Sequence, residues 1–338
     1  MTQQTSGKKH RKLKRRLIIT IAAVVAAYVI LVNFLVSAAL VPSFMTRLPA
    51  FDRIVADSFE KQVHSKTIKK NADFTRKYMK KFRAQTPTRF LSVKTDDGYR
   101  LYATEFYHEQ PTHLYALVLH GYTGSREEMF PYATYYYNHD YNTIVPDLRC
   151  SGVSEGDYIG MGWTDHFDCV KWIDLILSED PDAQIVLHGQ SMGAATALMM
   201  TGETDVSENI KAVISDCSYT DAYSMFGEKI REWFHLPAFP FVDSACICLR
   251  LRGGYILKDA SALEAVKKSH TPTLFIHGME DKMISVHMSQ DLYDAAACKK
   301  ELLLVEGAGH AQAAAKDSKT YYRTISAFLK EALDSPAP

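Results

Sequence analysis

The chain has 338 residues, enough for one large domain or two ordinary ones, and its 39 basic and 39 acidic side chains give a formal net charge of zero. The first 16 residues hold seven Lys or Arg and no acid, which leaves 32 basic and 39 acidic residues in the remainder. This mildly acidic body gives no reason to expect nucleic-acid binding. With 47% hydrophobic and 23% charged residues, the composition is that of a globular protein.

The basic cluster precedes Leu17–Val41, an apolar run without a charged side chain. As a helix, this run is about 37 Å long and crosses a hydrocarbon core of about 30 Å with some tilt. A cleaved signal peptide, whose apolar region is about 7–15 residues, remains the alternative, with small residues at 37–39 for cleavage. We favour an uncleaved signal anchor at 17–41, behind a cytoplasmic tail at 1–16. The bulk of the chain is then expected to be extracytoplasmic, at the cell membrane.

Residues 42–87 predict a helical connector, which begins at Pro42, where the span ends. Apolar side chains recur near helical spacing in two sets, at Phe51, Ile54, Val55, Phe59 and Val63 and then at Ile68, Phe74, Tyr78 and Phe82. We expect one or two amphipathic helices that pack on the following domain or lie near the membrane surface. Packing is favoured, because the polar face of these helices mixes both charge signs.

From residue 88 the pattern becomes typical of strands. Residues 89–94 and 99–104 flank Asp96-Asp97-Gly98, a hairpin turn signal. Six apolar runs then alternate with helical stretches, at 114–119, 143–145, 184–187, 212–214, 273–276 and 301–305. This alternation predicts one α/β domain over 88–333, with a mostly parallel eight-stranded sheet and helices on both faces.

One connection is too long for a simple crossover. More than fifty residues, rich in aromatics, separate the predicted strands at 212–214 and 273–276. An excursion of this kind predicts a helical cap over the active site at about 218–270, and a plain surface insertion is the alternative.

The cysteines offer no clear chemistry. Their spacing selects neither a disulfide pairing nor a zinc site, and an exported domain could oxidise some of them. We favour buried free thiols for most of the six, which are Cys150, Cys169, Cys217, Cys246, Cys248 and Cys298. We expect neither a metal nor an organic cofactor.

The most informative motif is Gly189-Gln190-Ser191-Met192-Gly193. It follows an apolar strand at 185–187 and precedes good helix formers at 194–200. A strand, a sharp turn with Ser between two glycines, and a helix make up a nucleophile elbow. The pattern recurs at 152–156, but a loop-like segment follows it there. Context therefore selects Ser191 as the nucleophile, and we interpret Ser154 as a polar loop residue.

A serine nucleophile needs a base and an acid that orients the base, in the chain order Ser, acid, His. Asp281 follows the seventh predicted strand and His310 the eighth, at the strand ends where sites form in such sheets. Glu280 is the competing acid, and the spacing from His277-Gly278 favours Asp281. Two further histidines before glycines, His188 and His277, are more typical of structural positions.

The reaction also needs backbone donors for an oxyanion. The N–H groups of Met192, after the nucleophile, and of Tyr122, in the loop His120-Gly121-Tyr122-Thr123-Gly124, are the candidates.

Taken together, these motifs resemble those of α/β hydrolases, in the broad group of serine aminopeptidase-like (S33-type) hydrolases and Bem46-like esterases. The resemblance covers about residues 88–333. Its motifs are His120-Gly121-x-x-Gly124, Asp147-x-Arg149-x-x-Gly152-x-Ser154-x-Gly156, Gly189-x-Ser191-x-Gly193, His277-Gly278-x-x-Asp281 and Gly309-His310. The group usually has Gly at the position of Cys150, a departure outside the catalytic motifs.

The residues and the resemblance imply a membrane-anchored serine hydrolase that cleaves acyl esters of a small or lipid-like substrate through an acyl-enzyme. An aminopeptidase-like or thioester hydrolase, an acyltransferase and an inactive binding protein of the same fold remain as alternatives.

Overall fold

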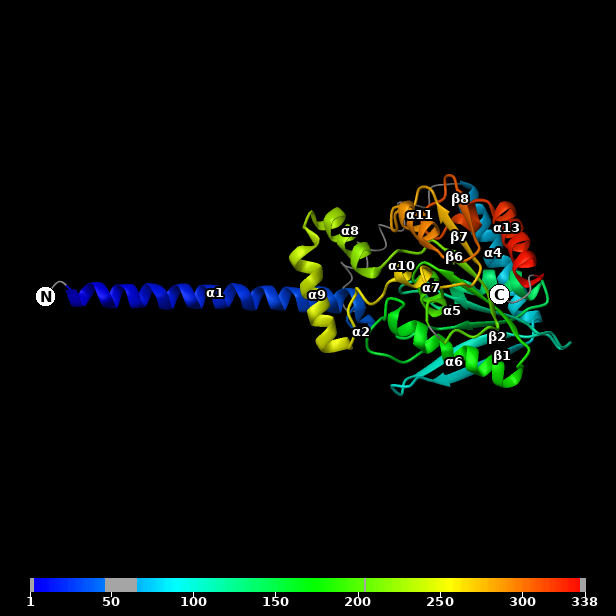
Figure 1. Ribbon diagram of the computed structural model, residues 1–338, viewed down its shortest axis with the longest axis horizontal. Helices are drawn as coiled ribbons and strands as arrows, with labels where there is room; N and C mark the ends of the chain where they lie inside the picture. The colour runs from blue at the N-terminus through cyan, green and yellow to red at the C-terminus, as the bar shows by residue number, and fades with distance from the viewer. Residues whose placement is uncertain (1–2, 46–65, 204, 335–338) are drawn as a thin grey trace.

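The computed structural model describes residues 3–45, 66–203 and 205–334. A single long helix, α1 (Gln3–Leu40), projects from the body of the molecule and carries the N-terminus at its far end (Figure 1). The short helix α2 (Pro42–Met45) follows it. The connector helix predicted around Phe51–Val63 lies outside the described residues, whereas the second one is α4 (Lys66–Gln85).

The predicted eight-stranded, mostly parallel sheet is confirmed. Its order is β1-β2-β4-β3-β5-β6-β7-β8, in which β2 runs antiparallel to both of its neighbours and all other pairs are parallel. The strands are β1 (Thr88–Lys94), β2 (Arg100–Phe106), β3 (Leu114–Leu119), β4 (Asn142–Pro146), β5 (Gln184–Gln190), β6 (Ile210–Asp216), β7 (Thr273–Gly278) and β8 (Lys300–Val305).

Helices cover both faces of this sheet, because the side chains of its buried strands alternate between two cores. Leu117 and Leu187 belong to one core, with Trp172 of α6, whereas Val118 and Val186 belong to the other, with Phe328 of α13. The helices of the body are α5 (Arg126–Tyr137), α6 (Trp163–Glu179), α7 (Met192–Thr201), α11 (Val286–Ala295), α12 (Ala313–Lys316) and α13 (Ser318–Asp334). The six cysteines are free thiols.

The long connection between β6 and β7 forms three helices, α8 (Ala222–Phe234), α9 (Ala238–Gly253) and α10 (Ala262–Val266). In Figure 1, α9 crosses α1 at the point where α1 meets the body, and α8 lies beside it. Val32, Val36 and Leu40 of α1 are buried in the same core as Val242 and Leu249 of α9. The last turns of the apolar helix are therefore packed as part of the folded domain.

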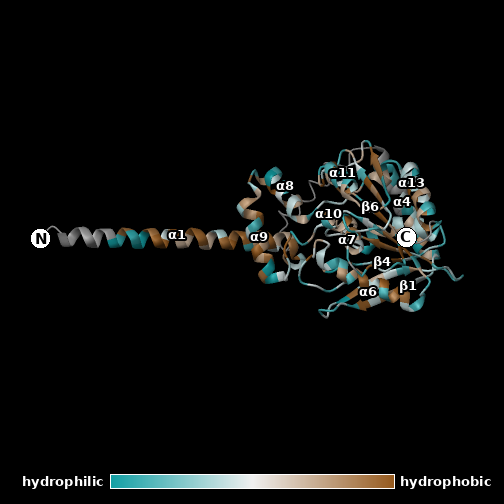
Figure 2. Cartoon of the chain, viewed as in Figure 1, coloured by the Kyte–Doolittle hydropathy of each residue, from teal (hydrophilic) through white to brown (hydrophobic). Residues whose placement is uncertain are grey.

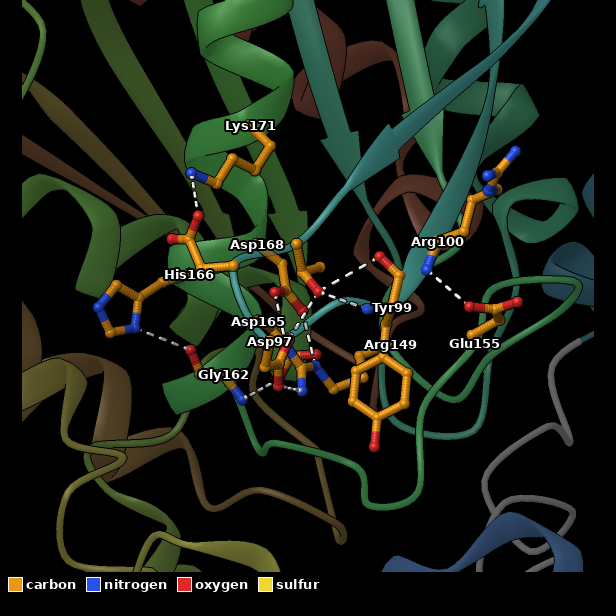
Figure 3. Close-up of polar contacts among 12 residues, drawn as sticks. Asp97, Tyr99, Arg100, Arg149, Glu155, Gly162, Asp165, His166, Asp168 and Lys171 are labelled. Carbon is orange, nitrogen blue, oxygen red and sulfur yellow. Dashed lines mark hydrogen bonds and ion pairs between the residues drawn. The ribbon is translucent and has the colours of Figure 1, made fainter.

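A charged cluster fixes the loop that follows β4. The Arg149 guanidinium donates to both carboxylate oxygens of Asp168, at 2.7 and 2.8 Å, and to those of Asp97 in the hairpin turn, at 2.5 and 3.0 Å (Figure 3). The hydroxyl of Ser154 donates to the Asp147 carbonyl at 2.7 Å and accepts the Tyr102 N–H at 2.9 Å. Ser154 thus ties its loop to β2, which agrees with its interpretation as a loop residue.

Candidate active site

Ser191 occupies a tight turn between β5 and α7. Its φ of 55° and ψ of −116° are unusual for a residue with a side chain, and its N–H donates to the Asp216 carbonyl at 2.8 Å. A Cβ atom at Gly189 would lie 2.1 Å from the Gly193 oxygen, and one at Gly193 would lie 2.3 Å from the Leu119 oxygen. Both neighbours must therefore be glycine if the serine is to project above the sheet.

The three residues predicted as a triad lie in one hydrogen-bonded chain. The Ser191 hydroxyl is 2.9 Å from Nε2 of His310, and Nδ1 of His310 is 2.7 Å from Oδ2 of Asp281. All three side chains are buried, and they follow β5, β8 and β7 respectively. Glu280, the competing acid, is exposed. With Asp281 accepting the Nδ1–H of His310, Nε2 is the ring atom that accepts a proton from the serine.

The Asp281 carboxylate is held by four donors. Its Oδ1 accepts the N–H groups of Met283 and Ile284, at 2.8 and 2.9 Å, and its Oδ2 also lies 3.1 Å from Nε2 of His277. Burial alone would raise the pKa of the Asp281 carboxyl, but the charge of His310 and the hydrogen bonds of His277 and His310 outweigh burial and hold it well below its usual range. Asp281 is therefore ionised at neutral pH.

His277, which the sequence indicated only as a structural residue, contacts the acid of the triad. Its Nδ1 lies 2.6 Å from the Ser289 hydroxyl, and its Nε2 lies 3.0 Å from the Ile284 carbonyl. Both neighbours of Nε2 are acceptors, so Nε2 donates to the Asp281 carboxylate and to the Ile284 carbonyl. Nδ1 then accepts the hydrogen bond of the Ser289 hydroxyl. His277 thus positions the acid of the triad, a role that the His-Gly motif before Asp281 could have suggested.

The loop of Tyr122 lies directly beside the serine. A Cβ atom at Gly121 would be 3.3 Å from the Ser191 Cβ. His120 anchors this loop, because its Nδ1 donates to the Gly121 carbonyl at 2.7 Å and its Nε2 accepts the Leu148 N–H at 2.9 Å. Burial lowers the pKa of His120, which keeps the ring neutral and suits both bonds. The loop that holds Gly121 and Tyr122 therefore borders the nucleophile on one side, and Met192, the first residue of α7, follows it directly in the chain.

A cavity of about 400 Å³ lies over Ser191 and His310. The cap helix α8 contributes Phe226, Lys229 and Trp233 to its wall, and α1 contributes Ala39. The hydroxyl of Tyr122, which also lines the cavity, donates to the Ala39 carbonyl. Sequence reasoning missed these lining residues, because helical periodicity gives the buried face of a helix but not which buried residues reach a cavity.

Two buried residues at the carboxyl end of β6, Asp216 and Cys217, also lie near the triad. Asp216 accepts the Tyr321 hydroxyl at 2.9 Å, and burial raises its pKa to about 6. Cys217 has its sulfur within 4.8 Å of ligand atoms of Asp281 and His310. Burial raises the pKa of this thiol far above its usual value, so it is neutral beside the triad. In this group His310 and Asp281 already hydrogen-bond to each other, and His310 also hydrogen-bonds to Ser191.

Comparisons with known proteins identify the architecture. Residues 117–241 match the family model described as the alpha/beta hydrolase fold. The uncharacterized protein YqkD of Bacillus subtilis is 28% identical over 82% of this chain and 90% of its own length. The solved esterase Pf2001 of Pyrococcus furiosus has a TM-score of 0.61 at 21% identity, and the alignment covers 74% of this chain and 93% of the esterase. The acylaminoacyl peptidase of Pyrococcus horikoshii reaches 0.57 at 18% identity, over 76% of this chain and 44% of the peptidase.

Proposed function

We propose that this chain, a member of the α/β-hydrolase superfamily, is a membrane-anchored serine hydrolase that cleaves acyl esters. The observation that carries the proposal is the hydrogen-bonded chain Ser191–His310–Asp281 beneath a cavity. An esterase and a peptidase among the proteins of similar fold support a hydrolase, and neither selects the bond that is cleaved. Ester cleavage is the first candidate because an alcohol makes less demand on leaving-group protonation than the amine released from a peptide.

In this mechanism the Ser191 oxygen attacks the acyl carbonyl while Nε2 of His310 takes its proton. His310 then delivers that proton to the leaving alcohol, which departs and leaves an acyl-enzyme. Water attacks the acyl carbon with His310 again as the base, and the serine is restored. Asp281 holds His310 in the required tautomer and stabilises the imidazolium that forms in both steps.

Two backbone N–H groups, of Tyr122 and Met192, would stabilise the oxyanion. Two observations support this role: Gly121, next to Tyr122, lies beside Ser191, and Met192 begins α7, whose N-terminal dipole favours negative charge. Losing one such donor typically costs about 10²–10³ in rate.

The membrane anchor is α1. Among the described residues, Arg11–Leu40 is the stretch long and apolar enough to cross a bilayer. The burial of Val32, Val36 and Leu40 in the domain supports an uncleaved anchor, because cleavage near 37–39 would remove part of that core. The basic residues before Leu17 favour a cytoplasmic N-terminus. A reporter active only outside the cytoplasm, fused after Pro338, is therefore expected to be active, and a stable but silent fusion would contradict this topology.

A fluorophosphonate probe tests the chemistry, because it labels only an activated serine. The full chain in detergent is expected to react, and Ser191→Ala is expected to lose both labelling and ester hydrolysis. Ser154→Ala, in the second copy of the motif, is the matched control and should keep both. A folded wild-type protein that does not label would overturn the proposal and favour a binding protein of the same fold.

A further inference from the structure

The apolar helix α1 is joined to the cap through its few polar groups. The Tyr28 hydroxyl lies 2.9 Å from the Ser244 hydroxyl of α9. Arg252, also of α9, donates to the carbonyl and side-chain oxygens of Asn33, at 3.3 Å each, and to the Ser37 hydroxyl at 2.9 Å. A polar side chain in a membrane helix needs such a partner. These pairs fix one face of α1 against the cap.

An apolar groove of about 270 Å³ lies between α1 and the cap. Every lining residue except Lys229 is apolar or aromatic, and the Lys229 ammonium is already bound by Glu232 at 2.5 Å and by the Lys282 carbonyl at 2.9 Å. The groove shares walls with the catalytic cavity, since both are lined by Ala39, Phe226, Lys229 and Trp233. It therefore adjoins the site where the acyl carbonyl meets Ser191.

The length of α1 places this groove at the depth of the membrane. Between Leu17 and Leu31 nearly all side chains of α1 are exposed, over a helix length of about 22 Å. A hydrocarbon core is about 30 Å thick, so about 8 Å more is required. That length corresponds to Val32–Val36, which packs against the cap and lines the groove. When α1 crosses the whole hydrocarbon core, the part of the cap that packs against Val32–Val36 therefore lies within the outer leaflet.

The outer surface of the cap fits this position. On α9, Phe239, Ile247 and Leu251 are 73%, 65% and 82% exposed. Figure 2 shows that the hydrophobic part of α1 runs up to α9, the helix that carries these three exposed side chains. Large apolar side chains exposed at such a junction are typical of a membrane-contacting surface.

We propose that the groove between α1 and the cap receives the acyl chain of a lipid ester directly from the bilayer and presents its carbonyl to Ser191. The transmembrane helix is then one wall of the substrate site as well as an anchor. We assign a lipid acyl chain to this groove for two reasons. The groove is apolar and shares walls with the catalytic cavity, and it lies at the depth of lipid chains. This inference rests on the proposed ester hydrolysis and adds its substrate class.

The test uses the full chain in phosphatidylcholine nanodiscs with butyryl and hexadecanoyl esters of the same fluorogenic alcohol. The wild type is expected to prefer the hexadecanoyl ester in kcat/KM. Leu35→Trp and Ile230→Trp narrow the groove from opposite walls. Each methylene of the acyl chain that the groove buries raises kcat/KM about fourfold. A variant that displaces two of these methylenes should therefore lower the hexadecanoyl-to-butyryl ratio of kcat/KM about fifteenfold. Val170→Trp, at an exposed position on α6, is the matched control and should leave the ratio unchanged.

Labelling by a fluorophosphonate confirms that each variant has folded. Unchanged ratios in both labelled groove variants, or a wild type that cleaves only the butyryl ester, would overturn the inference. Lipid access is measured separately in Ser191→Ala, where phosphatidylcholine with brominated chains is expected to quench Trp233 fluorescence, and Trp233→Phe identifies that signal. Quenching without any hydrolysis would refute the proposed function while retaining a lipid groove. Absence of quenching would refute the groove itself.

Discussion

Replacing Asp281 by Asn tests the triad with a change of one atom. The backbone N–H groups of Met283 and Ile284 both donate to Oδ1 and have no alternative orientation. The new amide must therefore keep its oxygen on that side and turn its NH2 group toward Nε2 of His277 and Nδ1 of His310. That nitrogen becomes an acceptor, so the ring proton moves to Nε2, which then faces Ser191 and cannot take its proton.

We expect this inverted tautomer to lower kcat by about 10⁴, which corresponds to about 5.4 kcal/mol of transition-state stabilisation. The assay is hydrolysis of a soluble butyryl ester by purified protein, with the thermal midpoint measured in parallel. Glu280→Gln makes the same chemical change at the exposed neighbouring acid and should reduce kcat less than twofold. An Asp281→Asn enzyme within tenfold of the wild type, or an equal loss in Glu280→Gln, would refute the reasoning.

Two further predictions concern the elbow and the stability of the fold. Gly193→Ala would place a methyl carbon 2.3 Å from the Leu119 carbonyl oxygen, so we expect at least a hundredfold loss of esterase activity, and an active variant would contradict the described elbow. Burial raises the pKa of Asp165, whose carboxylate accepts the Gly162 N–H at 2.8 Å, to about 7 (Figure 3). The folded state then holds this proton more tightly than the unfolded state, so stability falls as the pH rises from about 4 to about 7. Asp165→Asn should therefore raise the thermal midpoint more at pH 8 than at pH 5, and equal shifts at both values would contradict this.

The sheet could be predicted from the sequence because each element carries its own local signal. The hairpin has Asp96-Asp97-Gly98, the buried strands are continuous apolar runs, and the elbow has glycines that its close backbone contacts require. Asp281 and His310 could be predicted as well, since parallel strands bring their carboxyl ends together. The structure brings both residues to Ser191.

The contact between α1 and the cap could not be predicted in the same way. A membrane helix is apolar on all sides, so its pattern does not separate the face that meets lipid from the face that meets Val242 and Leu249. Asn33 and Ser37 could have indicated which face of α1 meets protein, because polar groups in such a helix need partners. Their partner Arg252 is more than two hundred residues away in the chain, and only the fold joins them.

The hydrogen bond from Tyr122 to Ala39 links two parts of the molecule that meet different surroundings. Its hydroxyl is bound to the last turn of α1, and its backbone borders Ser191. A transmembrane helix adjusts its tilt to the local thickness of the bilayer. With α1 as the proposed anchor, an altered tilt in a thinner or thicker membrane would act through Ala39 on the loop beside Ser191. The rate of the proposed hydrolysis would then depend on the lipid chain length of the surrounding bilayer.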